Sequence, residues 1–269
     1  MDFSNNFNNL APPSSVNISL IGARLPNNTH LYFRAKQKEI VNQYSAARLF
    51  LKETECIDWE HWFVKDEDDA INETMQNALK SYFYEAALFY YNILVDLSWT
   101  LCYVAAEYSI NHNGERISFV GMKSIEEAAE LLRKAEGMTT NPTAETNPFE
   151  YLKTMSPEYT EAIDLIIAFW KDFGSSDIRR KYNYCKHKGK PCYSELQKAE
   201  GGRLFRFYII PKGEDAIQVA SDTRDVQWKI SLNESIEELR NFDDNILYPY
   251  LLQLIKVLEE TINTTQMLL

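Results

Sequence analysis

Apolar residues recur every three or four positions over long parts of the chain, which is the period of an amphipathic helix. Residues 29–55 carry one such stripe, and residues 71–111 carry a longer one whose other faces are also apolar. We expect the first stretch to form a helix and the second to form the long central helix of a bundle. The stripe residues are Ile40, Tyr44, Ala47 and Leu51 in the first stretch and Leu79, Phe83, Ala86, Tyr90, Ile93, Leu97, Leu101 and Val104 in the second.

Capping residues and helix breakers divide the next part of the chain into shorter helices. A capping box at 124–127 opens a helix that stops at Gly137, and the polar segment 139–147 is typical of a loop. Pro157 stands at the first position of another helix, which Gly174 ends. Ser175 or Ser176 can then cap a short helix that carries residues 179–188.

A run of strand-forming segments interrupts the helices before the last one begins. Residues 203–210, 216–220 and 226–232 are rich in strand formers, and the third segment alternates apolar and polar positions. A helix follows from Ser235, with Pro249 kinking or splitting it. The pattern therefore predicts a mainly α protein: a flexible arm over 1–28, then one helical-bundle domain over 29–269. A small antiparallel sheet is inserted at about 203–232, before the last helix.

Composition favours a soluble cytoplasmic protein. Apolar residues make up 45% of the 269 residues, which is enough for a core, and four cysteines are too few for a disulfide framework. The N-terminal segment lacks the basic and apolar regions of a signal peptide. Residues 86–106 are apolar enough to suggest a membrane span, but Asn92 and Asp96 near their middle favour a buried core helix. We expect no contact with a membrane.

One segment departs sharply from the overall charge of the chain. The net charge of −11 argues against a protein that coats nucleic acids, yet residues 179–190 contain six Arg or Lys and no acid. On a helix, Arg180, Asn183 and His187 would project from one side. A histidine exchanges protons near neutral pH, an arginine holds phosphate, and an amide orients either partner. The segment is therefore a candidate site for phosphate chemistry.

These residues resemble a known motif. Arg180, six further residues and His187, with Asn183 between them, are similar to the Arg-x4–6-His motif of the HEPN superfamily (higher eukaryotes and prokaryotes nucleotide-binding). Lys186 directly before His187 is similar to uncharacterised bacterial members. The resemblance implies a HEPN-like bundle of four or five helices that dimerises and brings two copies of the motif together. Many members are metal-independent ribonucleases of toxin–antitoxin and anti-phage systems, and others are inactive binding modules.

The resemblance implies catalytic roles for three residues of the segment. Arg180, Asn183 and His187 would be catalytic in an endoribonuclease that cleaves RNA through its 2′-OH, without a metal or a cofactor. RNA, a second copy of the chain and an antitoxin protein would be its partners. Two features depart from the family: Gly189 stands where some members carry a modified tyrosine, and the strands are not part of the common core. The residues expected to contact RNA phosphates are Arg179, Lys181, Lys186 and Lys188.

A polar trio in the predicted central helix supports this site. Glu85, Asn92 and Asp96 are spaced by seven and four residues, which places them within about 40° on the helical wheel. Polar groups aligned on a buried helix need partners. We expect Arg180 or Lys186 to pair with Asp96 or Glu85, so that the acid would hold the cation in place.

Other interpretations stay open at this point. The basic segment could bind nucleotide, RNA or protein without catalysis, or it could pair with acidic surface of a structural helical dimer. Cys185, His187 and Cys192 do not form a zinc motif, because no second Cys/His pair stands at zinc spacing. A nuclease requires Arg180 and His187 open to solvent in a shared cleft, whereas the structural dimer requires carboxylates over the segment.

Overall fold

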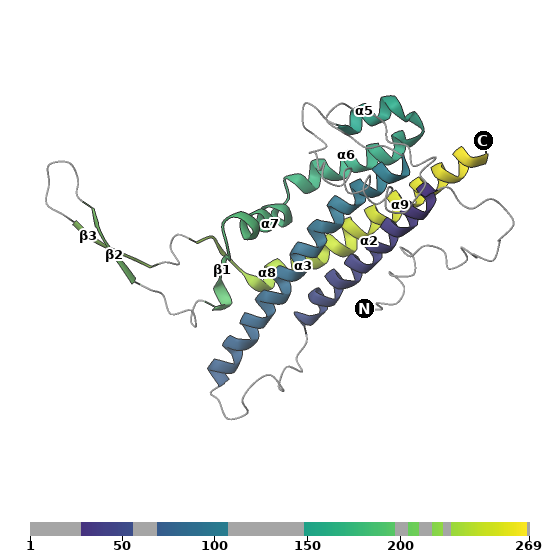
Figure 1. The fold of residues 1–269 in the computed structure, drawn as a ribbon. Coiled ribbons are helices and arrows are strands. Elements are labelled where there is room, and N and C mark those ends of the chain that lie inside the picture. Colours follow the sequence, from purple (N-terminus) through teal and green to yellow (C-terminus); the bar gives the residue numbers. More distant parts are fainter. Residues whose placement is uncertain are drawn as a thin grey trace.

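The computed structural model describes residues 28–55, 69–106, 148–196, 204–209, 217–222 and 227–267. Within these ranges the protein is mainly helical, and its long helices pack as a bundle, as predicted (Figure 1). The N-terminal arm up to residue 27, the helix expected at 124–137 and the loop expected at 139–147 lie outside the described residues.

Three long helices lie side by side and form the body of the protein (Figure 1). They are α2 (Asn28–Glu53), α3 (Asp69–Ala105) and α9 (Tyr248–Met267). The stripe predicted for α2 is confirmed, since Ile40, Tyr44 and Ala47 are fully buried. An amphipathic helix is stabilised mainly by burying such a stripe against its neighbours.

The long central helix is confirmed as α3, and the buried stripe predicted on it is correct only in part, since Leu101 and Val104 are buried. The fully buried face runs through Tyr84, Leu88, Tyr91 and Leu94, whereas Ile93 of the predicted stripe is exposed. The reason is that α3 is apolar around most of its circumference, so spacing alone does not show which face is covered. Packing of α2, α7 and α9 against α3 decides it.

By length and composition alone, one helix of the described chain could cross a membrane, the Ile71–Ala105 part of α3. In the fold, 67% of its apolar window is buried inside the protein. Its neighbouring helices thus cover most of the surface that a lipid would otherwise meet.

Shorter helices cover one end and one side of this body. They are α5 (Pro148–Met155), the 3₁₀ turn η2 (Pro157–Tyr159), α6 (Thr160–Gly174), α7 (Asp177–His187) and α8 (Leu232–Phe242). The helix predicted to begin at Pro157 and end at Gly174 is confirmed as η2 and α6, and α5 is an addition that the pattern did not indicate.

The strands form two small sheets in place of the single antiparallel sheet that we expected. β2 (Leu204–Ile209) and β3 (Ile217–Asp222) pair antiparallel, as predicted, and lie to one side of the bundle in Figure 1. β4 (Lys229–Ile230) pairs instead with β1 (Cys192–Tyr193), and this pairing is parallel. The predicted antiparallel third strand is therefore wrong, because β1, which follows α7 directly, takes up the edge of β4.

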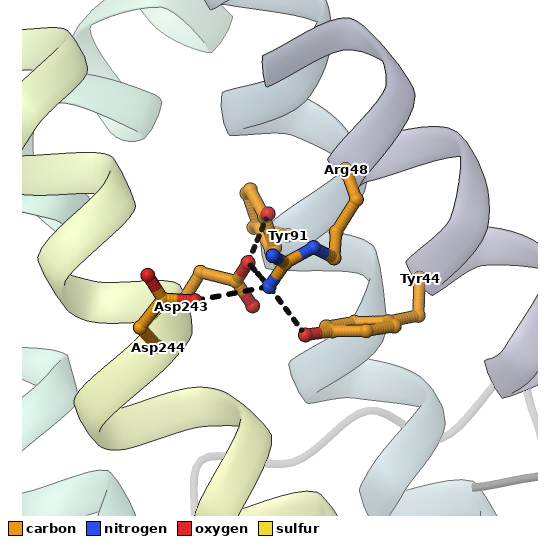
Figure 2. A network of polar contacts seen from close by, with 5 residues as sticks. All are labelled: Tyr44, Arg48, Tyr91, Asp243 and Asp244. Atoms are coloured by element: carbon orange, nitrogen blue, oxygen red, sulfur yellow. Dashed lines mark hydrogen bonds and ion pairs between the residues drawn. The ribbon is translucent and has the colours of Figure 1, made fainter. Parts of the chain in front are cut away.

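A buried ionic network joins α2, α3 and the turn before α9 (Figure 2). Arg48 Nη1 lies 2.6 Å from Asp243 Oδ2 and 3.0 Å from Asp244 Oδ1. Arg48 also donates to the Tyr44 hydroxyl at 3.0 Å, and the Tyr91 hydroxyl donates to Asp243 Oδ2 at 2.8 Å. The contacts tie three segments that are far apart in the sequence.

The two acids of this network lie in a π-helical turn, η5 (Asp243–Leu247), between α8 and α9. Pro249 follows in the first turn of α9, where we expected a kink or a break. Proline has no N–H to donate to the residue four positions earlier, and a wider turn accommodates that loss. The break predicted near Tyr248 is thus present as a π-helical turn that ends at Leu247.

Candidate functional site

Local sequence signals define both ends of α7, the helix that carries the basic segment. The Ser176 side chain caps its N-terminus by accepting from the Arg179 N–H at 3.2 Å. Asp177 in the first turn and Lys186 and His187 in the last turn suit the helix dipole. Gly189 then turns the chain with φ of 102°, a conformation that glycine adopts without strain. The short capped helix predicted here is confirmed.

The two faces of α7 differ in their exposure to solvent. Ile178, Lys181 and Tyr182 are buried against the bundle. Arg180, Asn183 and His187 lie on the opposite side and are exposed to solvent. The three candidate catalytic side chains therefore share one open face, as their spacing indicated.

Arg179 anchors α7 to the central helix. Its Nη1 donates to the Oδ1 of the fully buried Asn92 at 3.0 Å. Its guanidinium also lies among aromatic rings, 5.0 Å from the ring centre of Tyr182 and 5.4 Å from that of Trp170. A cation with these partners positions a helix and is not free to take an RNA phosphate.

The acids of α3 do meet cations from α7 and the segment after it. Burial raises the pKa of Asp96, while the positive charges of Arg179 and Lys186 act in the opposite direction. Glu85 accepts from the Tyr193 hydroxyl at 3.0 Å and lies 3.9 Å from Lys190 Nζ. Both carboxylates thus lie near cations of α7 or of the segment that follows it, and their role as supporting acids stays a prediction.

The pairing that we expected for Arg180 is wrong. Its Nη2 lies 2.9 Å from Asp177 Oδ1, one turn earlier on α7, and both side chains are exposed. Arg180 projects away from α3, so neither Asp96 nor Glu85 is its partner. Among the residues that the structure describes, the carboxylate that pairs with Arg180 on the outer face of α7 is Asp177.

The outer face of α7 forms one wall of an open cleft of about 850 Å³. Arg180, Asn183 and His187 all line it, so the three residues share one solvent-filled space. The cleft is also lined by Gly174, Ser175, Ser176, Tyr184, Lys188 and Trp228.

Trp228 is a lining residue that the sequence did not single out. The backbone N–H of Trp228 donates to the Tyr184 hydroxyl at 3.0 Å, and the backbone carbonyl of Trp228 accepts from the Cys192 N–H at 2.9 Å. The Arg180 guanidinium lies 5.0 Å from the centre of its ring. The β1–β4 pairing brings it to α7 from a distant part of the sequence, and only its place in an alternating segment hinted at a defined orientation.

The set of residues expected to contact phosphates becomes smaller. Lys181 is 5% exposed and forms an ion pair with Glu238, so it stabilises the packing of α7 on α8. Arg179 is occupied by Asn92 as described. Lys188 is exposed and lines the cleft with Arg180. Lys186 is also exposed, but it lies 5.7 Å from the Tyr182 ring and its charge acts on Asp96.

The cysteines near the cleft are buried or half-buried and do not have the environment of a reactive thiol. Cys192 is fully buried, and burial raises the pKa of the half-buried Cys185 thiol to about 11, so this thiol is protonated at neutral pH. Among the residues that the structure describes, no three His, Cys, Asp or Glu side chains gather in a way that could hold a metal ion.

Comparison with known proteins adds no relative. No protein-family model, no curated protein and no solved structure matches this chain. The resemblance to the HEPN superfamily therefore stays a prediction from the residues of α7.

Proposed function

We propose that the α7 cleft binds single-stranded RNA and cleaves it without a metal. The observation that carries the proposal is that Arg180, Asn183 and His187 line one open cleft of about 850 Å³. The competing idea of a basic strip paired with the protein's own acids fits Arg180 with Asp177 and Lys181 with Glu238, whereas His187 and Lys188 at the cleft are exposed. The HEPN resemblance of the same three residues points to the same chemistry.

The proposed reaction is an internal transfer at one phosphodiester. The ribose 2′-oxygen forms a bond to the adjacent phosphorus, and the bond from phosphorus to the 5′-oxygen of the next nucleotide breaks. His187 takes the proton of the 2′-OH, and the leaving oxygen receives a proton from water. The products carry a 2′,3′-cyclic phosphate and a 5′-OH. The substrate is RNA because DNA lacks the attacking hydroxyl.

Arg180 and Asn183 have distinct parts in this reaction. Arg180 stabilises the extra negative charge that builds up on the phosphate oxygens in the transition state. Asn183 stands between Arg180 and His187 on the same face and orients the reacting groups. Lys186 and Lys188 hold flanking phosphates at the C-terminal end of α7, in a chain whose total charge is otherwise strongly negative.

One observation favours a second candidate function, a non-catalytic module that binds RNA or nucleotide. Arg180 already contacts Asp177 and the Trp228 ring. Such contacts fit a residue that binds a ligand but does not take part in catalysis. Cleavage separates the two candidates, because binding alone leaves the RNA intact.

The test is incubation of the purified protein with a mixed RNA pool in EDTA. His187→Asn keeps the size and polarity of the side chain but removes its proton exchange. We expect it to lower the cleavage rate by about 100-fold or more, with RNA binding nearly unchanged. Lys256→Ala, an exposed cation on α9, is the control and should cleave like the wild type.

Two outcomes would contradict the proposal. Cleavage that is undiminished in His187→Asn would show that this histidine is not the proton acceptor. Cleavage that EDTA abolishes would show that a metal carries the reaction. Absence of cleavage with retained binding would favour the non-catalytic module.

We also propose that the active form is a homodimer in which two α7 helices approach one another. This follows from the resemblance to a family that pairs its motifs, and the exposed face of α7 is available for it. Light scattering at micromolar concentration should give about twice the chain mass of 31.3 kDa. A monomer mass would contradict the dimer.

A further inference from the structure

Among the described residues that line the cleft, Trp228 is the aromatic residue that does not come from α7. It directly precedes β4 and its side chain is partly exposed, although indole rings usually bury most of their surface. The Tyr184 ring packs on it edge-on, at 5.4 Å between centres and 63° between planes. An edge contact leaves room for a flat partner beside the indole.

The backbone around Trp228 is held from both sides. Its N–H and carbonyl bond to Tyr184 and to Cys192, as described above. Downstream, the Glu195 carboxylate accepts from the N–H groups of Leu232 and Asn233 at 2.9 and 3.0 Å, which fixes the start of α8. The backbone that carries the indole is therefore fixed before any ligand arrives, and the Tyr184 ring contacts the indole itself, which lowers the cost of ordering it for a ligand.

Arg180 links this ring to the phosphate chemistry of the cleft. Its guanidinium lies over one face of the indole ring, 5.0 Å from the ring centre, and pairs with Asp177, so a base would stack on the other face or take the place of the guanidinium. Arg180 is exposed, and an exposed ion pair contributes little to stability, so a phosphate can replace Asp177 at low cost. A planar ring beside such a cation suits a nucleotide, whose base stacks while its phosphate takes the charge.

We propose that Trp228 stacks on a nucleobase of the bound RNA, next to the phosphate that Arg180 contacts. The proposal rests on the RNA-binding function proposed above and identifies the part of the RNA that the cleft recognises. It makes the site selective for single strands, because the bases of a duplex are already stacked on one another. It also predicts tolerance of sequence with a preference for purines, whose larger rings stack more strongly.

The test measures binding in the His187→Asn background, so that the probe stays intact. The probes are fluorescent single-stranded oligo(rA), oligo(rU) and an abasic sugar–phosphate chain of the same length. Binding of oligo(rA) should be tighter than that of the abasic chain by about 5- to 100-fold in Kd. Trp228→Leu should remove most of this difference, whereas Trp228→Phe should keep most of it.

The abasic comparison needs no change at Trp228 and therefore stands even if Trp228→Leu does not fold. Equal affinity of the His187→Asn protein for oligo(rA) and for the abasic chain would overturn the proposal. Oligo(rA) binding that is unchanged in a folded Trp228→Leu variant would also overturn it. Preference for oligo(rA) by a protein that cleaves no RNA would support the stacking and refute the nuclease function, so the two failures are distinguishable.

Discussion

Two arginines of this protein have partners of the same kinds but very different surroundings. Arg48 and Arg180 each pair with an aspartate and lie near an aromatic ring, that of Tyr44 at 5.7 Å and that of Trp228 at 5.0 Å. The side chains of the Arg48–Asp243 pair are 4% and 1% exposed. Those of the Arg180–Asp177 pair are 65% and 56% exposed.

The difference separates a structural arginine from one that is available for a ligand. Arg48 joins α2 to the turn between α8 and α9, and its pair with Asp243 is buried away from water (Figure 2). Arg180 lines an open cleft, and its ion pair with Asp177 is exposed. Water or a phosphate can therefore replace Asp177 as its partner. Exposure, more than the identity of the partners, therefore marks the candidate site.

The largest expected effect concerns the buried pair. Arg48→Met leaves the Asp243 carboxylate buried without its cation and should lower the free energy of unfolding by about 3–5 kcal/mol at pH 7. Urea unfolding measures this change. The double variant Arg48→Met/Asp243→Leu should recover at least half of the loss, because it removes the uncompensated charge as well.

The exposed pair provides the matched control for this experiment. Asp177→Ala should change the free energy of unfolding by no more than about 1 kcal/mol, since both side chains stay in water. A similar decrease in the free energy of unfolding in Asp177→Ala and Arg48→Met would contradict the distinction between a structural and an exposed ion pair.

A smaller effect is expected in the pH dependence of stability. Burial raises the pKa of Asp243 from 3.8 to about 6, against the opposing influence of Arg48 and the tyrosine hydroxyls. Between these two values the folded state holds a proton that the unfolded state lacks, so stability falls as pH rises from about 4 to 6. The loss is at most about 3 kcal/mol, because one pKa unit corresponds to about 1.4 kcal/mol.

Asp243→Asn isolates this contribution. Unfolding of the wild type and the variant should be compared at several pH values across the window. The difference in stability between them should change steadily from pH 4 to 6 and level off above it. A constant difference over the whole window would show that Asp243 does not take up a proton there.

The smallest effect distinguishes two lysines of the same helix. Lys188 is exposed at the cleft, so Lys188→Ala should weaken RNA binding and lower the salt slope of log K by about 0.7. Lys181 is buried against Glu238, so Lys181→Met should lower the melting temperature and leave the salt slope unchanged. Binding measured by anisotropy at several salt concentrations tests both, and the reverse pattern would refute the assignment.

Periodicity predicted elements best where one face of a helix differs from the rest. The stripe of α2 was correct because its other faces are polar, whereas the stripe of α3 was correct only near the C-terminal end of the helix, because most of its faces are apolar. The π-helical turn before Pro249 and the parallel β1–β4 pair depend on contacts between distant segments. Local pattern carries no information on such contacts.

The candidate site was predictable only in part for the same reason. The spacing of Arg180, Asn183 and His187 placed them on one face of a helix, and that face is open. The charge of Lys181 did not reveal its burial, because burial depends on which face of α7 packs on the bundle. Trp228 reaches the cleft through pairing with β1, so its position follows from the fold alone.

The most direct test of the proposed site is the chemical nature of the ends that it leaves on RNA. The protein is incubated with a single-stranded RNA in EDTA, beside the same RNA with 2′-deoxy nucleotides throughout, and the products are weighed by mass spectrometry. We expect a 2′,3′-cyclic phosphate and a 5′-OH from the RNA, and no cleavage of the 2′-deoxy strand. Products with a 5′-phosphate and a 3′-OH, or equal cleavage of both strands, would contradict attack by the 2′-OH at Arg180 and His187.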